Sequence, residues 1–221
     1  MIRLFIGNKA YSSWSLRGWL ALKQSGLPFE ELVVPLYDDD WSQRRHDDEF
    51  APAGGKVPLL WDGDIVVWDS LAIVEWLADR VGRDRYWPQD DAARAMARSM
   101  AAEMHSGFAP LRQECTMNLR HVVPTPVLSP SAKANIARID ALWQLARERH
   151  GDGGPYLFGA FGAVDIMFAP VVTRFLTYSV AVSDTAARYM QVMLDHPWMQ
   201  QWIAAAHAEP WVIEQFEPRP A

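Results

Sequence analysis

The sequence predicts a small α/β domain followed by an all-helical domain. Short apolar runs typical of β-strands occur only before residue 70, and from Ala92 onward the apolar residues recur with helical spacing. Between these parts, glycine, proline and charged residues interrupt the periodicity, as in a linker. We therefore expect a first domain at residues 1–81, a linker at 82–90 and a helical domain at 91–221.

Length and composition exclude several classes of protein. The 221 residues are enough to bury roughly 70% of the unfolded surface. No apolar run approaches the ~20 residues of a membrane span, and the N-terminus lacks the apolar region of a signal peptide, so we expect a soluble, cytoplasmic protein with no membrane partner. The single Cys115 excludes an internal disulfide framework. The six histidines show no paired spacing, so no metal site is expected.

Charge and aromatic content point toward a small-molecule partner. The formal charge is −6 and no cluster of lysines or arginines offsets it, which argues against nucleic-acid binding. Eleven tryptophans is a high count and suggests either an aromatic-lined cavity or a large helix interface.

Strand and helix patterns alternate in the first domain. Apolar runs at residues 2–6 and 29–34 predict two strands. Between them, the Ser12–Ser13 pair precedes apolar residues with helical spacing, and Gly26 is typical of the position just after a helix. Residues 41–50 predict a short polar helix or turn.

A β-hairpin is the strongest local signal. Two apolar runs flank Asp62-Gly63, a dipeptide that favours a tight turn with positive φ at both central positions. Pro58 precedes the first strand and must lie at an edge or in a cis turn. Val57 is then free to offer its N–H and C=O groups to an extended, peptide-like ligand.

A helix is expected directly after the hairpin. Leu71, Ile73, Val74 and Leu77 mark one face of it, and Ser70 lies at its N-terminus, where free amides favour an anion. Asp69 and Ser70 also suit a purely structural capping role.

The second domain contains helical patterns separated by loops. The expected helices are residues 92–119, 131–150, 163–179, 184–194 and 198–206, with a proline-rich loop at 122–130. Within the first of these helices, His105, Phe108 and Arg112 are spaced to share one face.

The motifs resemble those of a known family. Lys56-Val57-Pro58-Leu59, followed by Asp69-Ser70-Leu71-Ala72-Ile73, is similar to the glutathione-binding half of the glutathione S-transferases, and the element order resembles a thioredoxin-like domain. The resemblance implies glutathione as co-substrate, with Ser70 at its γ-glutamyl carboxylate and Asp69 near its ammonium group. Lys56 meets the glycyl carboxylate or, alternatively, protects a strand edge from aggregation.

A second motif concerns the thiol group of glutathione. Tyr11-Ser12-Ser13-Trp14-Ser15-Leu16-Arg17 resembles the serine-type motif of zeta-like transferases, in which the first serine stabilises the thiolate. This implies Ser12 as the activating residue, with Ser13 as the alternative, although either serine can simply cap the helix. Trp14 stands where that class has a cysteine.

The second substrate is expected between the two domains. The residues we expect to line its pocket are Tyr11, Trp14, His105, Phe108 and Arg112. Arg112 or Arg174 can bind an acidic substrate, although a surface salt bridge is the commoner role of an arginine. Cys115 and Met104 are expected in the core.

The resemblance implies a transferase that joins the glutathione sulfur to a small electrophilic molecule. The alternatives are a glutathione-dependent isomerase or dehalogenase, and a binding module of the same fold without turnover. The family resemblance also implies a homodimer in which the first domain of one chain packs against the second domain of the other.

Overall fold

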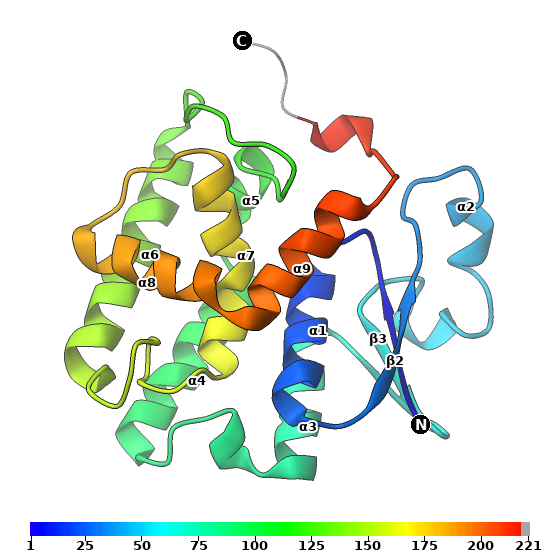
Figure 1. The fold of residues 1–221 in the computed structure, drawn as a ribbon, viewed down its shortest axis with the longest axis horizontal. Coiled ribbons are helices and arrows are strands. Elements are labelled where there is room, and N and C mark those ends of the chain that lie inside the picture. The colour runs from blue at the N-terminus through cyan, green and yellow to red at the C-terminus, as the bar shows by residue number, and fades with distance from the viewer. Residues whose placement is uncertain (218–221) are drawn as a thin grey trace.

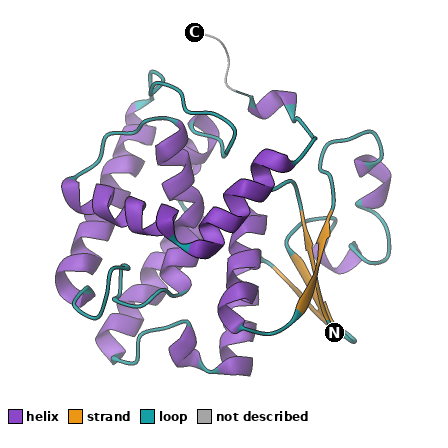
Figure 2. Cartoon of the chain, viewed as in Figure 1, coloured by secondary structure: helices purple, strands orange, loops and turns teal. Residues whose placement is uncertain are grey.

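The N-terminal part of the molecule is a mixed four-stranded sheet covered by helices. The computed structural model describes residues 1–217, and Figures 1 and 2 show the sheet beside the helical region. The strands are β1 (Ile2–Ile6), β2 (Phe29–Val33), β3 (Leu59–Asp62) and β4 (Ile65–Trp68), and the helices of this part are α1 (Ser13–Ser25), α2 (Trp41–Arg44) and α3 (Ser70–Val81). The strand order is β2-β1-β3-β4, with β1 and β2 parallel and the other pairs antiparallel. The predicted order of elements is therefore confirmed.

The central strand β1 is buried on both faces. Its residues alternate, so that Leu4 and Ile6 join the main core while Phe5 packs against Phe50 and Leu59 on the opposite face. Because β1 lies between β2 and β3, the loop after Ile6 leaves the sheet at a fixed position. That loop leads into α1, which begins after Ser12 and ends at Gly26 with φ of 71°, as expected.

The hairpin turn differs from the prediction by one residue. Asp62 pairs with Ile65 as the last residue of β3, so the central residues of the turn are Gly63 and Asp64, and only Gly63 has positive φ. The prediction of Asp62-Gly63 as the centre was wrong because Asp62 is held in the ladder, where its carboxylate pairs with Arg80 at 2.7 Å. The Val57–Pro58 peptide bond is cis, one of the two expected arrangements.

The C-terminal part is helical. Its helices are α4 (Asp91–Ser106), α5 (Ala109–Glu114), α6 (Pro130–His150), α7 (Ala163–Thr177), α8 (Asp184–Asp195) and α9 (Pro197–Ala208), followed by a 3₁₀ turn at Glu214–Phe216. Helix α7 is buried almost all round and contacts both α1 and α4. Within residues 1–217, every helix is too short or too polar to cross a bilayer.

The single helix predicted at residues 92–119 is two helices in the structure. The expected single helix at 92–119 is interrupted between α4 and α5, where Gly107 is extended and Phe108 has φ of 62°. Pro110 contributes, because it has no N–H to continue the hydrogen-bond ladder. The prediction that His105, Phe108 and Arg112 share one helix face was therefore wrong, since His105 lies on α4 and Arg112 on α5.

Helix α1 approaches the sheet region most closely at Gly18. A Cβ atom on Gly18 would lie 2.7 Å from Cβ of Pro58, so the two elements touch only because glycine has no side chain. We predict that Gly18→Ala lowers the free energy of unfolding by about 1–3 kcal/mol through overpacking. This exceeds the gain of up to about 1 kcal/mol in helix propensity.

Urea denaturation measures this difference, with Gly153→Ala as the matched control. A Cβ on Gly153 would meet only Gly159 Cα at 3.8 Å, an ordinary contact. If the two variants are equally stable, the Gly18–Pro58 contact does not restrict the packing of α1.

Candidate functional site

A cavity of about 730 Å³ opens where the N-terminal ends of α1 and α3 face α4. Of the residues singled out in the sequence, those in its lining are Ser12, Trp14, Lys56, Val57, Pro58, Asp69, Ser70 and His105. They come from the β1–α1 loop, α1, the segment before β3, the β4–α3 junction and α4. The fold thus brings together four segments that are far apart in the sequence.

Ser12 presents its hydroxyl at the start of α1. Its Oγ accepts a hydrogen bond from Ser15 N at 3.3 Å and lies 2.7 Å from Ser15 Oγ, which in turn accepts from Gly7 N at 2.8 Å. In the bond between the two hydroxyls the Ser12 hydroxyl is the donor, and rotation about its Cβ–Oγ bond turns the same proton toward a ligand. Ser13 is the first residue of α1, is buried and is not in the cavity lining.

Asp69 is the N-cap of α3. One carboxylate oxygen accepts from Leu71 N at 2.8 Å and Ala72 N at 3.3 Å, and the other lies 3.1 Å from His105 Nε2 on α4. The structural capping role is therefore present. The same carboxylate also forms part of the cavity wall.

Ser70 has a buried hydroxyl without a partner. The residue is 1% exposed, and among the described residues no group hydrogen-bonds to its Oγ. A buried hydroxyl that lacks a partner lowers stability by about 1–3 kcal/mol. Because Ser70 lies in the cavity lining, at the N-terminus of α3, this hydroxyl is suited to a ligand.

The segment before β3 offers backbone groups. Val57 lies outside the strand ladder, and within residues 1–217 neither its N–H nor its C=O has a hydrogen-bond partner. Lys56 is exposed and, in the same part of the chain, forms no ion pair. An extended ligand can therefore bind alongside this segment.

Two arginines contact Trp14, and a third, Arg174, lies close enough to both to affect their charges. The guanidinium carbons of Arg17 and Arg112 are 4.6 and 4.9 Å from the Trp14 ring centroid, and Trp14 also contacts the His105 ring edge-on. Arg112 Nε donates to Gly107 O at 3.0 Å, and Arg174 Nη1 donates to Cys115 O at 2.6 Å.

The expectation of surface salt bridges for Arg112 and Arg174 was wrong. Both donate to backbone carbonyls, and burial lowers the pKa of Arg174 to about 10 and also lowers the pKa of Arg112. Burial of Arg17 likewise lowers its pKa. In the described residues these three cations have no carboxylate hydrogen-bonded to them, so the interior behind Trp14 is electropositive.

Three residues of the expected second-substrate pocket are not in this lining. Tyr11 is buried and donates to Glu217 Oε1 at 2.5 Å, and burial raises its pKa to about 12. Phe108 lies in the core, and Arg112 stands behind Trp14. Met104 and Cys115 are buried as expected, and burial raises the pKa of Cys115 to about 11.

Seven residues that the sequence analysis did not single out also line the cavity, among them Tyr37, Trp41, Arg45 and Trp68. The signal for Trp41 and Trp68 was the high tryptophan count, which suggested an aromatic-lined cavity. No pattern in the sequence indicated Tyr37 or Arg45. Among the described residues, no group of three or more His, Cys, Asp or Glu side chains is arranged to hold a metal ion.

The chain is similar in sequence and in fold to known proteins. Residues 11–80 match the family model described as glutathione S-transferase, N-terminal domain. Human glutathione S-transferase theta-1 is 31% identical over 150 residues, which are 64% of this chain but only 60% of the human protein. Rat maleylacetoacetate isomerase is 28% identical over 172 residues, covering 77% of this chain and 76% of that protein. A glutathione transferase homolog from Burkholderia, crystallised with bound glutathione, has the same fold with a TM-score of 0.67, at 22% identity over 94% of this chain and 98% of its own.

The two polar residues at the start of α3 differ in their effect on stability. We predict that Asp69→Ala lowers the free energy of unfolding by about 1 kcal/mol, because two amides lose their cap. Ser70→Ala, by contrast, removes a hydroxyl without a partner and should leave stability unchanged or raise it by up to about 1 kcal/mol.

Chemical denaturation of both variants without ligand tests this difference. A loss of more than about 1 kcal/mol for Ser70→Ala would mean that the hydroxyl is already satisfied in the free protein.

Proposed function

We propose that the chain is a member of the glutathione S-transferase family and a glutathione transferase, an enzyme that joins the sulfur of glutathione to a small electrophilic molecule; the family-model match and the similarity to named transferases support this. The observation that carries this proposal is the convergence of Ser12, Val57 and Ser70 in one cavity. These residues offer a hydroxyl, a free peptide edge and a second hydroxyl, which suit a thiol, a peptide backbone and a carboxylate.

In this proposal glutathione lies across residues 1–81. The unpaired hydroxyl of Ser70 binds the γ-glutamyl carboxylate at the start of α3, where the positive end of the helix dipole favours an anion. Asp69 lies near the ammonium group, and Val57 pairs with the peptide backbone as an added strand would. The glycyl carboxylate meets Lys56 or Arg45, both of which line the cavity.

Ser12 is proposed to activate the thiol in the manner of the serine-type, zeta-like transferases. A free thiol has a pKa of about 8.5, so it is mostly protonated at neutral pH. A hydroxyl that donates to the sulfur, together with the positive end of α1, stabilises the thiolate and lowers this pKa. The thiolate then attacks an electrophilic carbon, forming a C–S bond while the leaving group departs with its electron pair.

The electrophile is proposed to bind on the α4 side of the cavity, with Trp14 and His105 in its wall. In this arrangement residues 82–90 link the glutathione domain to a substrate domain at 91–221. Tyr11, Phe108 and Arg112 shape this region from behind the lining. We also propose a cytoplasmic homodimer that packs the first domain of one chain on the second domain of the other.

A glutathione-dependent isomerase is the second candidate. The similarity to a maleylacetoacetate isomerase favours it, whereas Trp14 stands where the zeta-like motif has a cysteine. A dehalogenase differs only in the substrate that the thiolate attacks. A binding module without turnover would retain glutathione and consume no electrophile.

We predict that Ser12→Ala lowers kcat with chlorodinitrobenzene by about a hundredfold, because the thiolate loses a preorganised donor. The pKa of the bound thiol should rise toward about 8.5, so the rising limb of the pH–rate profile should move to higher pH. The KM for glutathione should change little, because Val57 and Ser70 still bind the peptide.

Ser13→Ala is the matched control, since Ser13 is the serine next to Ser12 and the first residue of α1 but is not in the cavity lining. It should retain most of the wild-type rate. If Ser13→Ala abolishes turnover and Ser12→Ala does not, the assignment within the pair is reversed.

Ser70→Ala tests the binding of the γ-glutamyl group. We predict about tenfold weaker binding of glutathione by calorimetry, the size expected for one hydrogen bond to a charged group. Glutathione lacking its α-carboxylate should bind both proteins equally. An unchanged affinity of Ser70→Ala for intact glutathione would place the carboxylate elsewhere.

A further inference from the structure

The loop that carries Ser12 is held by residues from the far end of the chain. This loop, residues 7–12, has no regular secondary structure of its own. The backbone amides of Lys9 and Ala10 donate to the two carboxylate oxygens of Glu209, at 2.8 and 3.2 Å. Glu209 follows the last residue of α9, and Figure 1 shows that helix ending beside the loop between β1 and α1.

Other contacts hold the same loop from the same side. Trp202 Nε1 on α9 donates to Lys9 O at 3.0 Å, and Leu119 N donates to Ala10 O at 3.1 Å. Together with the bonds to Glu209, these contacts give both the N–H and the C=O groups of Lys9 and Ala10 a partner. Its orientation therefore depends on the helical part of the molecule.

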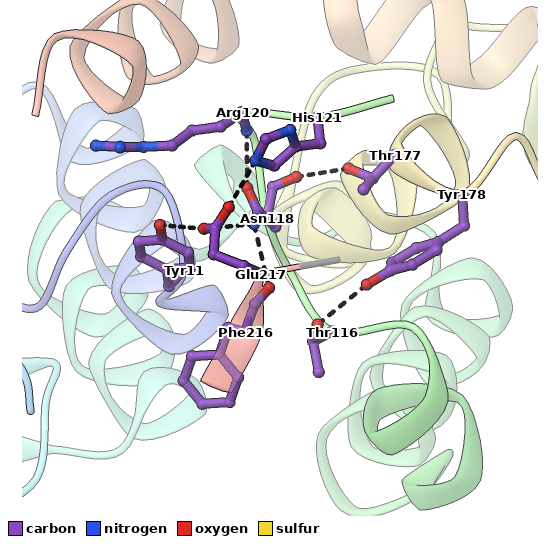
Figure 3. A network of polar contacts seen from close by, with 9 residues as sticks. All are labelled: Tyr11, Thr116, Asn118, Arg120, His121, Thr177, Tyr178, Phe216 and Glu217. Carbon is purple, nitrogen blue, oxygen red and sulfur yellow. Dashed lines mark hydrogen bonds and ion pairs between the residues drawn. The ribbon is translucent and has the colours of Figure 1, made fainter. Parts of the chain in front are cut away.

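The terminal segment adds a second carboxylate. Figure 3 shows Glu217 among Tyr11, Asn118 and His121. Its carboxylate accepts from the Tyr11 hydroxyl at 2.5 Å and from Asn118 Nδ2 at 3.0 Å, and it lies 2.6 Å from His121 Nε2. Tyr11 immediately precedes Ser12, so the loop is held on both sides of Ala10.

Of the two carboxylates, Glu209 binds the backbone of the loop, whereas Glu217 binds the Tyr11 side chain. It is half-buried, and two backbone amides point at its carboxylate, an arrangement that gives strong, charge-assisted hydrogen bonds. Burial raises the pKa of Glu209, while the amides of Lys9 and Ala10 and the charges of Lys9 and Arg120 act in the opposite direction. Lys9 Nζ is itself 2.5 Å from Glu31 Oε1. The carboxylate therefore has cationic and amide partners that suit a fixed position.

We propose that Glu209 is a positioning residue for Ser12, acting through the amides of Lys9 and Ala10. This inference rests on the proposed function, in which the Ser12 hydroxyl must meet the glutathione sulfur. A displacement of about 1 Å at a reacting group can lower a rate up to about a hundredfold. A carboxylate that fixes two consecutive amides, two and three residues before Ser12, limits such a displacement.

Two variants of Glu209 and one control test the proposal. Glu209→Ala removes both acceptors, and Glu209→Gln keeps one oxygen for one of the two amides. Glu214→Ala is the control, because Glu214 lies on the same terminal segment, is exposed and has no side-chain hydrogen bond within residues 1–217. If the alanine variant does not fold, the glutamine variant carries the test.

We expect Glu209→Ala to lower kcat about tenfold and to raise the pKa of the bound thiol, as seen in its pH–rate profile and in thiolate absorbance. The KM for glutathione should remain within about twofold of wild type, because the groups of Val57 and Ser70 are untouched. Glu209→Gln should lie between Glu209→Ala and the control. A role in stability alone would lower the unfolding midpoint and leave kcat and thiol pKa of the folded enzyme unchanged.

Hydrogen exchange gives a readout that needs no turnover. The amides of Lys9 and Ala10 should exchange faster in both Glu209 variants than in Glu214→Ala. Exchange, kcat and thiol pKa that all match the control would overturn the role of Glu209 while leaving the proposed function intact. A wild type without glutathione-dependent turnover would overturn both.

Discussion

The contact between Gly18 and Pro58 is the constraint on which the cavity depends. It sets how closely α1 approaches the segment before β3, and the two ends of that contact lead directly to functional groups. Toward the N-terminus, α1 begins at Ser12, and next to Pro58 lies Val57 with its free backbone groups. The distance between the proposed thiol site and the proposed peptide edge is therefore fixed by backbone packing.

Local electrostatics at the cavity differ from the charge of the whole chain. The protein carries a formal charge of −6, yet the cavity wall contains two helix N-termini, Lys56 and Arg45. Asp69, the acidic residue in the lining, already shares its carboxylate with two amides and with His105. Near Trp14, the buried Arg17 and Arg174 and the half-buried Arg112 donate to carbonyls. An anionic peptide suits such a cavity although the surface as a whole is acidic.

Both ends of the chain contribute to one loop. The residues between β1 and Ser12 hydrogen-bond to α9, to Glu209 directly after it and to the terminal segment, so the helical region also holds the loop that carries Ser12. In isolation the N-terminal sheet would leave the amides of Lys9 and Ala10 without these acceptors. This dependence gives a physical reason for the two regions to act as one unit.

The sequence by itself determined the elements and the motifs. A short apolar run predicted β1, a serine pair and Gly26 predicted the limits of α1, and the hairpin and the Asp69–Ser70 helix start followed from short-range preferences. Each of these signals depends on residues within a few positions of one another, which is the range over which propensity and capping act.

Only the tertiary structure decided the register of the turn, the break between α4 and α5, and the residues that line the cavity. Asp62 stays in β3, where it pairs with Ile65 and its carboxylate meets Arg80, and Tyr11 lies outside the cavity lining with its hydroxyl donating to Glu217. Glu209 meets Lys9 across about 200 positions of sequence. Contacts at such separations have no period or spacing in the sequence, because they arise from the packing of whole elements rather than from the preferences of neighbouring residues.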